Sequence, residues 1–184
     1  FFHRLNTIMT ITSNPIPQQI TPLSPNGFLF TVEKLPDLSY FCQNVTLPGL
    51  TLGSPDFGNP FASIPIPGDH LTYDTLNLQF QIDQSMTNYK AIYNWLVALG
   101  FPQTYQQYIN LIDSAAIASL SELAKNSSNA TLLILDHANN VSQTVNFYDI
   151  FPQSIETINF ESTNTDVPYI TGSATFKFSY YNFA

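Results

Sequence analysis

A change of hydrophobic period within one stretch, residues 71–100, most constrains how this chain folds. Across Leu76–Asp83, apolar residues occupy every second position, and polar residues such as Gln79 occupy the others. This is the period of a half-buried strand with one apolar face and one wet face. Across Asn88–Leu99, the apolar spacing becomes three to four residues, which predicts an amphipathic helix. The stretch therefore predicts a strand that leads through a short turn into a helix.

The orientation of this helix follows from the same spacing. Its apolar stripe is predicted to consist of Tyr89, Ile92, Tyr93 and Leu96. We expect this stripe to pack on the apolar face of the strands, with Trp95 largely buried beside it. Lys90 and Asn94 lie to the side of the stripe and are expected to point away from the strands.

The rest of the chain is dominated by strand patterns. Alternating residues predict strands at 28–33, 40–47, 131–135, 141–148 and 170–183, and another beginning over 155–160. His137–Asn140 is predicted to be a hairpin turn, and Phe151–Pro152 the end of that hairpin. A second helix is predicted to continue through Ile109, Ile112, Ala116 and Leu120 to about Lys125.

The fold class is therefore α+β and β-dominated, a two-sheet sandwich or open barrel with one main helix. Residues 1–26 are expected to be a proline-rich N-terminal arm. Residues 27–184 are expected to form a single domain.

The composition restricts the partners that the protein can bind. Only 10% of its 184 residues are charged, against a norm of about 25%. The chain is acidic, with a net charge of −8, and its five basic residues are scattered. A protein that grips DNA needs clustered Lys and Arg, so specific DNA binding is not expected. No apolar run reaches about 18 residues, so no membrane span is expected.

We find no pattern that predicts catalysis or metal binding. The three histidines are far apart in the sequence: His3, His70 and His137. The pairs Asp69–His70 and Asp136–His137 are expected to be solvated turns. The single cysteine, Cys42, excludes an internal disulfide and is expected to pack as a small apolar residue on a strand. We therefore expect a protein that is not an enzyme and that needs no cofactor.

The stretch from 48 to 70 is apolar but has no usable period. It contains five prolines and four glycines. Its large apolar residues are Leu50, Leu52, Phe57, Phe61, Ile64 and Ile66. One interpretation is a loop folded back on its own core. The other, which we favour, is a protrusion buried against a neighbouring subunit, because so long an apolar loop is rarely left in water.

Several segments, taken in order, carry a resemblance to a known family. They are Tyr40–Gly49, Ile66–Asp69, Thr75–Asp83, Asn88–Trp95, Phe151–Pro152 and Ala174–Tyr181. In order and content they resemble the tail tube proteins of contractile-tailed, T4-like bacteriophages, over roughly residues 27–183.

The resemblance implies a two-sheet subunit, six copies of which close a ring, each adding four strands to one inner barrel. Rings would stack through the long loop and terminal arms, and DNA would pass through the lumen without specific binding. The wet strand residues expected to line this lumen are Asn77, Gln79, Gln81, Thr175, Lys177 and Ser179. Lys177 could instead pair with an acid such as Asp83.

The same resemblance implies partners and a location. The expected partners are further copies of the chain and the tail sheath, baseplate and terminator proteins. The protein would be made in the host cytoplasm and located in the virion tail.

Three alternatives stay open. Within the family, the chain could form a ring that initiates or terminates the tube. It could also be the tube component of a contractile secretion system, which need not pass DNA. Outside the family, a carbohydrate-binding β-sandwich would explain the aromatic residues. Such a protein would carry exposed aromatics on loops, whereas most Phe and Tyr here follow strand periodicity.

Overall fold

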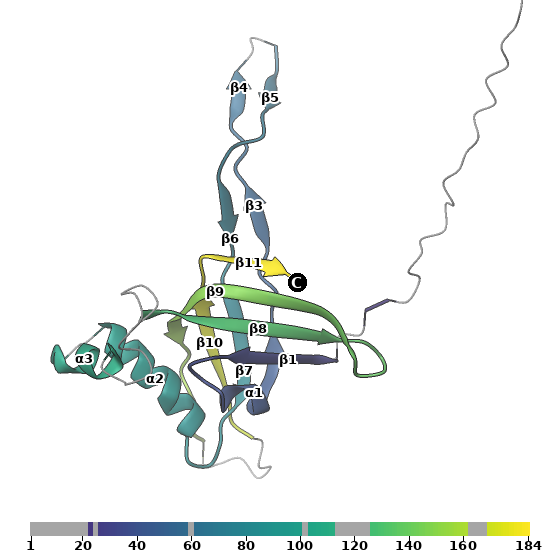
Figure 1. Cartoon of the computed structure of the whole chain (residues 1–184). Coiled ribbons are helices and arrows are strands. Elements are labelled where there is room, and N and C mark those ends of the chain that lie inside the picture. Colours follow the sequence, from purple (N-terminus) through teal and green to yellow (C-terminus); the bar gives the residue numbers. More distant parts are fainter. Residues whose placement is uncertain (1–21, 24–25, 59–60, 101–102, 113–125, 162–168) are drawn as a thin grey trace, which may run out of the picture.

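The computed structural model describes residues 22–23, 26–58, 61–100, 103–112, 126–161 and 169–184. They form two antiparallel sheets joined by one long strand, with helices against the sheets and a long arm projecting from them (Figure 1). The expected β-dominated α+β fold is confirmed. The proline-rich segment 1–21 and the continuation of the second helix through Ala116 and Leu120 lie outside the described residues.

Two sheets of four strands make up the body. Sheet A contains β1 (Phe28–Val32), β8 (Ser128–Leu135), the first half of β9 (Val141–Ile155) and β11 (Tyr180–Phe183). Sheet B contains β2 (Cys42–Val45), β7 (Leu76–Gln81), β10 (Thr171–Lys177) and the second half of β9. The strand order in sheet B is β9-β10-β7-β2.

Strand β9 crosses from one sheet to the other. At the crossing, Asp149 has a φ of 55°, and the hydroxyl of Ser127 donates to its Oδ1 at 3.3 Å. The expectation that Phe151–Pro152 ends this strand was wrong. Pro152 pairs with Phe176 next to a register shift, on the edge of sheet B, where a missing N–H is tolerated. The strand expected to begin over 155–160 was also wrong, because Ile155 is the last residue of β9.

Another predicted strand begins at a different residue in the structure, whereas the predicted hairpin turn is found where expected. The expected strand over 40–47 begins instead with one helical turn, α1 (Leu38–Phe41), because Leu38 is buried and its N–H donates to Leu35 O. The hairpin turn at His137–Asn140 is confirmed, with Asn139 at a φ of 60°. There the amides of Asn140 and Ala138 donate to the Asp136 carboxylate and lower its pKa.

The hydrophobic core lies between the two sheets and α2 (Thr87–Gly100). Its largest fully buried side chains include Phe30, Phe80, Phe147 and Phe176, one from each of four strands. The alternation predicted for β7 is confirmed, since Leu76, Leu78 and Phe80 are buried while the intervening residues face water. The helix itself is confirmed, and so is the burial of Trp95, which is 4% exposed.

The buried face of α2 differs from the predicted stripe. Ile92 is buried as expected, but the face also includes Asn88 and Trp95, whereas Tyr93 is 51% exposed. Polar atoms on this face have partners: Asn88 Nδ2 donates to Gln81 O at 2.7 Å, and Trp95 Nε1 donates to Asn126 O at 3.2 Å. Because the polar atoms of Asn88 and Trp95 are hydrogen-bonded, both side chains can be buried. With these two residues on the buried face, Tyr93 faces outward. Lys90 and Asn94 are exposed, as expected.

A second, shorter helix, α3 (Gln106–Ile112), follows α2. The C-terminal strand is interrupted after Lys177, and the chain then joins sheet A as β11. In the sequence, Tyr180 continues the alternate spacing of Ala174 and Phe176. Because it lies on another sheet, it does not share their buried face, and it is 47% exposed. The neighbouring Tyr181 packs against the core instead.

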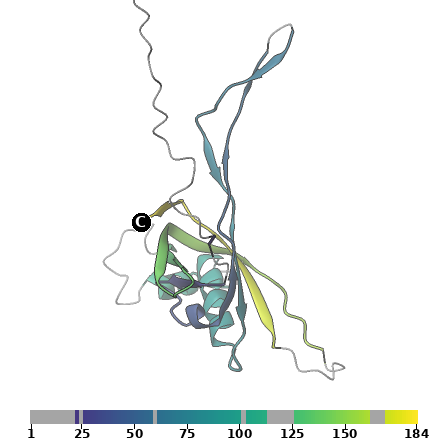
Figure 2. The same ribbon diagram turned by 90° about the vertical axis from the view of Figure 1, so that its right-hand side faces the viewer.

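The arm is a two-stranded ribbon rather than an irregular loop (Figure 2). Its lower half pairs β3 (Leu50–Leu52) with β6 (Leu71–Tyr73), and its upper half pairs β4 (Asp56–Gly58) with β5 (Ser63–Pro65). Between the halves the strands come so close that a Cβ on Gly68 would clash with the carbonyl oxygen of Gly53. Glycine is therefore required there for the ribbon to form.

Candidate assembly surfaces

The residues predicted to line a channel come mostly from two neighbouring strands. In sheet B, Thr175 lies opposite Asn77, with its hydroxyl 3.1 Å from Asn77 Oδ1. Gln79 lies opposite Ser173 on the same face, and Gln81 lies at the far end of the row. The other face of β7 and β10 is buried in the core. Sheet B thus has one dry face and one wet face lined by amides and hydroxyls.

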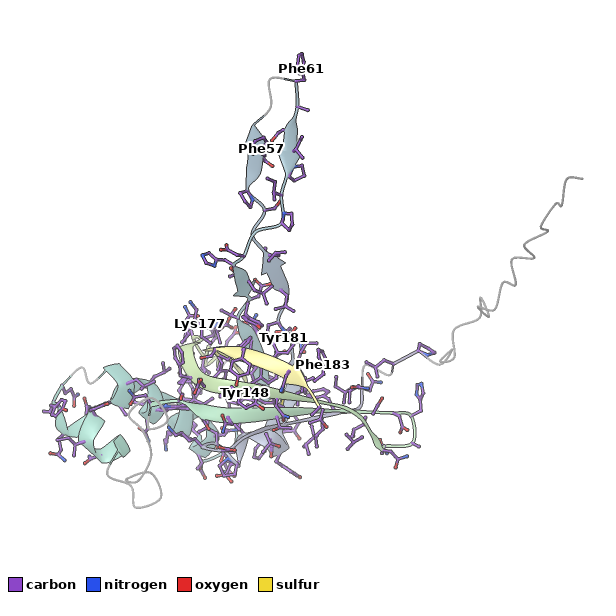
Figure 3. The ribbon with its side chains drawn as sticks, turned by 45° about the horizontal axis from the view of Figure 1, so that its top comes forward. Phe57, Phe61, Tyr148, Lys177, Tyr181 and Phe183 are labelled. Atoms are coloured by element: carbon purple, nitrogen blue, oxygen red, sulfur yellow. The ribbon has the colours of Figure 1, made fainter. Side chains whose placement is uncertain are left out.

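Lys177 and Ser179 are placed differently from one another. Lys177 ends β10 and lies near the foot of the arm (Figure 3). It lines a hollow of about 550 Å³ with Asn77, Asp74 and neighbouring residues. Asp83 lies beyond the opposite end of β7, and its Oδ1 accepts from the Thr87 amide at 2.6 Å. A Lys177–Asp83 pair is therefore contradicted. Ser179 lies in the bend between β10 and β11, where its amide donates to Tyr148 O, so it is not part of the strand row.

Sequence reasoning missed members of the wet face on the two outer strands of sheet B. Asn44 of β2 and Glu156, just after β9, line a shallow hollow with Gln79 and Ser173. A register shift in each of these strands hides the alternation that would have identified them. The charged side chains that line these two hollows are Lys177, Asp74 and Glu156, and most of the other lining residues are neutral and polar.

The two edges of sheet B have no strand partner within the described part of the chain. One edge is β2, and the other is the second half of β9, which pairs only with β10 over Phe151–Ile155. Unpaired edges present rows of N–H and C=O groups that can pair with another strand. The sheet cannot close on itself, so barrel closure requires other copies.

The arm carries the apolar residues singled out in the sequence, and all are exposed. They are Leu50, Leu52, Phe57, Phe61, Ile64 and Ile66. Phe57 is 62% exposed and Phe61, at the tip, is 95% exposed (Figure 3). The alternative of a loop folded back on its own core is therefore wrong.

The other residues singled out in the sequence are exposed or only partly buried. His70 Nδ1 lies 3.7 Å from Asp69 Oδ1, and both side chains are almost fully exposed on the arm. Cys42 begins β2 and packs partly against the core, which raises the pKa of its thiol to about 11. Within the described ranges, no three His, Cys, Asp or Glu side chains cluster in a way that could hold a metal ion. No helix there is long and apolar enough to cross a membrane.

Solved structures of contractile injection systems have a similar fold. A chain of the anti-feeding prophage tube-terminating cap is 16% identical with a TM-score of 0.59, and the match covers 96% of this chain and 99% of that one. A chain of the anti-feeding prophage baseplate, 6-fold symmetrised, is 10% identical with a TM-score of 0.56, covering 90% and 97%. A chain of the extended PVC sheath–tube complex is 13% identical with a TM-score of 0.53, covering 89% and 91%.

No curated protein sequence matches the chain. The family model described as phage tail tube protein matches residues 15–184, which is almost the whole chain. These findings agree with an open four-stranded sheet that has a wet face and with an exposed apolar arm. The chain belongs to the phage tail tube protein family.

Proposed function

We propose that six copies of this chain close their B sheets into one barrel, with the wet face inside, and that these rings stack into a tube through which DNA leaves the virion. The observation that carries the proposal is the construction of sheet B, with a dry face, a polar face and two open edges. Pairing β2 of one copy with the end of β9 of the next would satisfy both edges. A sixfold ring is supported by the likeness to the 6-fold symmetrised baseplate chain.

Channel lining is assigned to Asn77, Gln79, Gln81, Thr175 and Lys177. Amide and hydroxyl groups bind water well and offer phosphates few fixed cations, so DNA would slide past them without specific binding. Ser179, placed outside the strand row, is the weakest member of the original set. The protein would be made in the host cytoplasm before it joins the tail.

Stacking of rings is assigned to the arm. From Gly49 to the tip at Phe61 the chain can extend up to about 40 Å, whereas the seven residues of β10 span about 20 Å. The arm is therefore long enough to reach well past its own ring. Burying one of its large apolar side chains in a neighbour would contribute about 1.5–3 kcal/mol. The prolines of the arm reduce the entropy lost when it is ordered.

The outward face of α2 is assigned to the sheath side. The helix packs on the dry face of sheet B, so it lies on the opposite side of that sheet from the proposed lumen. Its exposed residues include Tyr93, Asn94 and Lys90, with a single charge among them. A surface with so few charges can contact a sheath without strong fixed ion pairs. Baseplate and terminator proteins are the expected partners at the two ends of the tube.

The test is electron microscopy of the purified chain and of the double variant Phe57→Ser, Phe61→Ser. We expect the wild-type chain to form tubes. The variant should keep its circular dichroism spectrum and melting temperature as a subunit but stop at single rings. Tyr93→Ser is the matched control, because it removes one exposed aromatic ring from the body, and it should still form tubes. A variant that unfolds as a monomer, or that still forms tubes, would refute the stacking role.

A second candidate function is a ring that begins or ends the tube, which the similarity to the tube-terminating cap favours. The same micrographs separate the two functions, since a terminating chain would stop at rings in its wild-type form. A tube from a contractile secretion system would form tubes as well. It would differ in having no DNA to conduct, which the lumen variants described below address.

A further inference from the structure

Aromatic side chains connect the foot of the arm to the core of the body. Tyr73 ends β6, and its ring centroid lies 5.5 Å from that of Phe178 and 5.6 Å from that of Tyr181. Both of these rings also contact the buried Phe147 of β9, at 5.2 Å and 5.5 Å. A continuous set of ring contacts therefore runs from the core through β11 to the arm.

A hydrogen bond from the same strand reaches the other side of the arm. The Tyr181 hydroxyl donates to the carbonyl oxygen of Pro48 at 3.2 Å. Pro48 lies two residues before β3, whereas Tyr73 ends β6. Strand β11 thus contacts both chain segments at the foot of the arm. Figure 3 shows Tyr181 near this foot.

The arm needs such a hold because a two-stranded ribbon alone is only marginally ordered in water. The arm is connected to the body by two chain segments, one at each end of the ribbon. Most of its large apolar side chains are exposed, so few packing contacts hold it in place. A neighbouring ring can receive the arm only when the arm points in one direction. If the free arm can point in several directions, stacking must first restrict it to one. The free energy of that restriction is subtracted from the affinity between rings.

We propose that β11 is a latch that sets the direction of the arm, with Tyr181 as its positioning residue, an inference that rests on the proposed role of the arm in stacking. The chain's final strand then contributes to assembly through the arm. Loss of the Tyr181 hydroxyl alone should increase the population of misdirected arms by up to about tenfold. Loss of the whole ring should increase it further, because the contacts to Tyr73 and Phe147 go as well.

The test is a distance measurement by pulsed electron paramagnetic resonance on the full chain, diluted until it is unassembled. Spin labels are placed on cysteines introduced at Ser63 in the arm and Asn94 in α2, with Cys42→Ala removing the native thiol. We expect a narrow distance distribution in this reference protein. It should broaden in Tyr181→Phe and broaden further in Tyr181→Ala. Tube growth should slow in the same order.

The matched control is Tyr180→Phe, which removes a hydroxyl from the same strand. Tyr180 stacks on Tyr148 with 4.6 Å between centroids, and adjacent residues of a strand point to opposite sides. The distance distribution of Tyr180→Phe should match that of the reference protein. Equal distributions in Tyr181→Phe and the reference, or equal broadening in Tyr180→Phe, would overturn the latch. If Tyr181→Ala unfolds, Tyr181→Phe and Tyr73→Leu decide the question.

The two proposals fail separately. A wild-type chain that forms no tubes overturns the stacking role of the arm, whatever the distances show. Distances that do not depend on Tyr181 overturn the latch, even if tubes form normally.

Discussion

Trp95 offers the sharpest test of how α2 is fixed to the body. Its side chain is 4% exposed, and its Nε1 donates to Asn126 O at 3.2 Å. The ammonium of Lys34 lies 5.2 Å from the ring centroid, and burial lowers the pKa of this lysine. Trp95→Ala would therefore leave a cavity, remove the donor to Asn126 O and remove the ring under Lys34.

The expected cost of Trp95→Ala is about 3–5 kcal/mol of unfolding free energy, the usual range for truncating a buried large aromatic. Losing the hydrogen bond contributes about 0.5–1.5 kcal/mol and the cation–π contact about 0.5–1 kcal/mol, which favours the upper half of that range. Trp95→Phe keeps an aromatic ring but loses the donor, so we expect a cost of about 1–2 kcal/mol.

Urea unfolding followed by far-UV circular dichroism measures these costs, on protein diluted below the concentration at which it assembles. Tyr93→Ala on the same helix is the control, and it should cost about 0.5 kcal/mol or less because Tyr93 is half exposed. A cost for Trp95→Ala as small as that of Tyr93→Ala would show that the helix does not pack through Trp95. The urea concentration at the unfolding midpoint of Trp95→Phe should lie between those of the wild type and Trp95→Ala.

Two further predictions concern the wet face and the partly buried thiol of Cys42. Gln79→Arg with Gln81→Arg should leave assembly intact but slow DNA ejection at low salt, because each added cation can bind a phosphate. The control is Gln143→Arg, at an exposed glutamine of β9 in sheet A, outside both the proposed lumen and the proposed sheath face. Unchanged ejection in the double variant would refute the lumen assignment. Burial raises the pKa of Cys42 to about 11, so the folded state holds this proton more tightly than the unfolded state, and stability should fall as the pH rises from about 9 through 11. Cys42→Ala should show a smaller fall in pH-dependent urea unfolding, and parallel curves for the two proteins would contradict the shifted thiol.

The elements that could be predicted from the sequence are those with one buried face and one wet face. Strand β7 and helix α2 have this property, and their periods identified both. The arm has no body beneath it, so neither face of its ribbon is buried and no alternation records its strands. Its apolar content still indicated that something must cover it. The structure shows these side chains exposed, and their burial against a neighbouring subunit stays a prediction.

The failures arose where tertiary contacts decide the outcome. Pro152 marks the end of a strand by local rules, but at a sheet edge its missing N–H costs nothing. Tyr180 follows the alternation of β10, yet the bend after Lys177 moves the chain to the other sheet and reverses which tyrosine faces inward. Tyr93 matches a helical stripe, but the hydrogen bonds of Asn88 and Trp95 select a face rotated away from it. The contact of β11 with the arm joins segments that are more than 100 residues apart in the sequence, so no local pattern predicts it.

The passage of β9 from sheet A to sheet B also affects how the subunit responds to force. Two stacked sheets held only by side-chain contacts can shear past one another when a load acts on one of them. Here the covalent backbone runs through both sheets at Asp149, so a pull on the edge of sheet B is transmitted along β9 into sheet A. Displacing one layer relative to the other then requires breaking the hydrogen bonds of a fifteen-residue strand. A tube built from such subunits would resist twisting as a single wall.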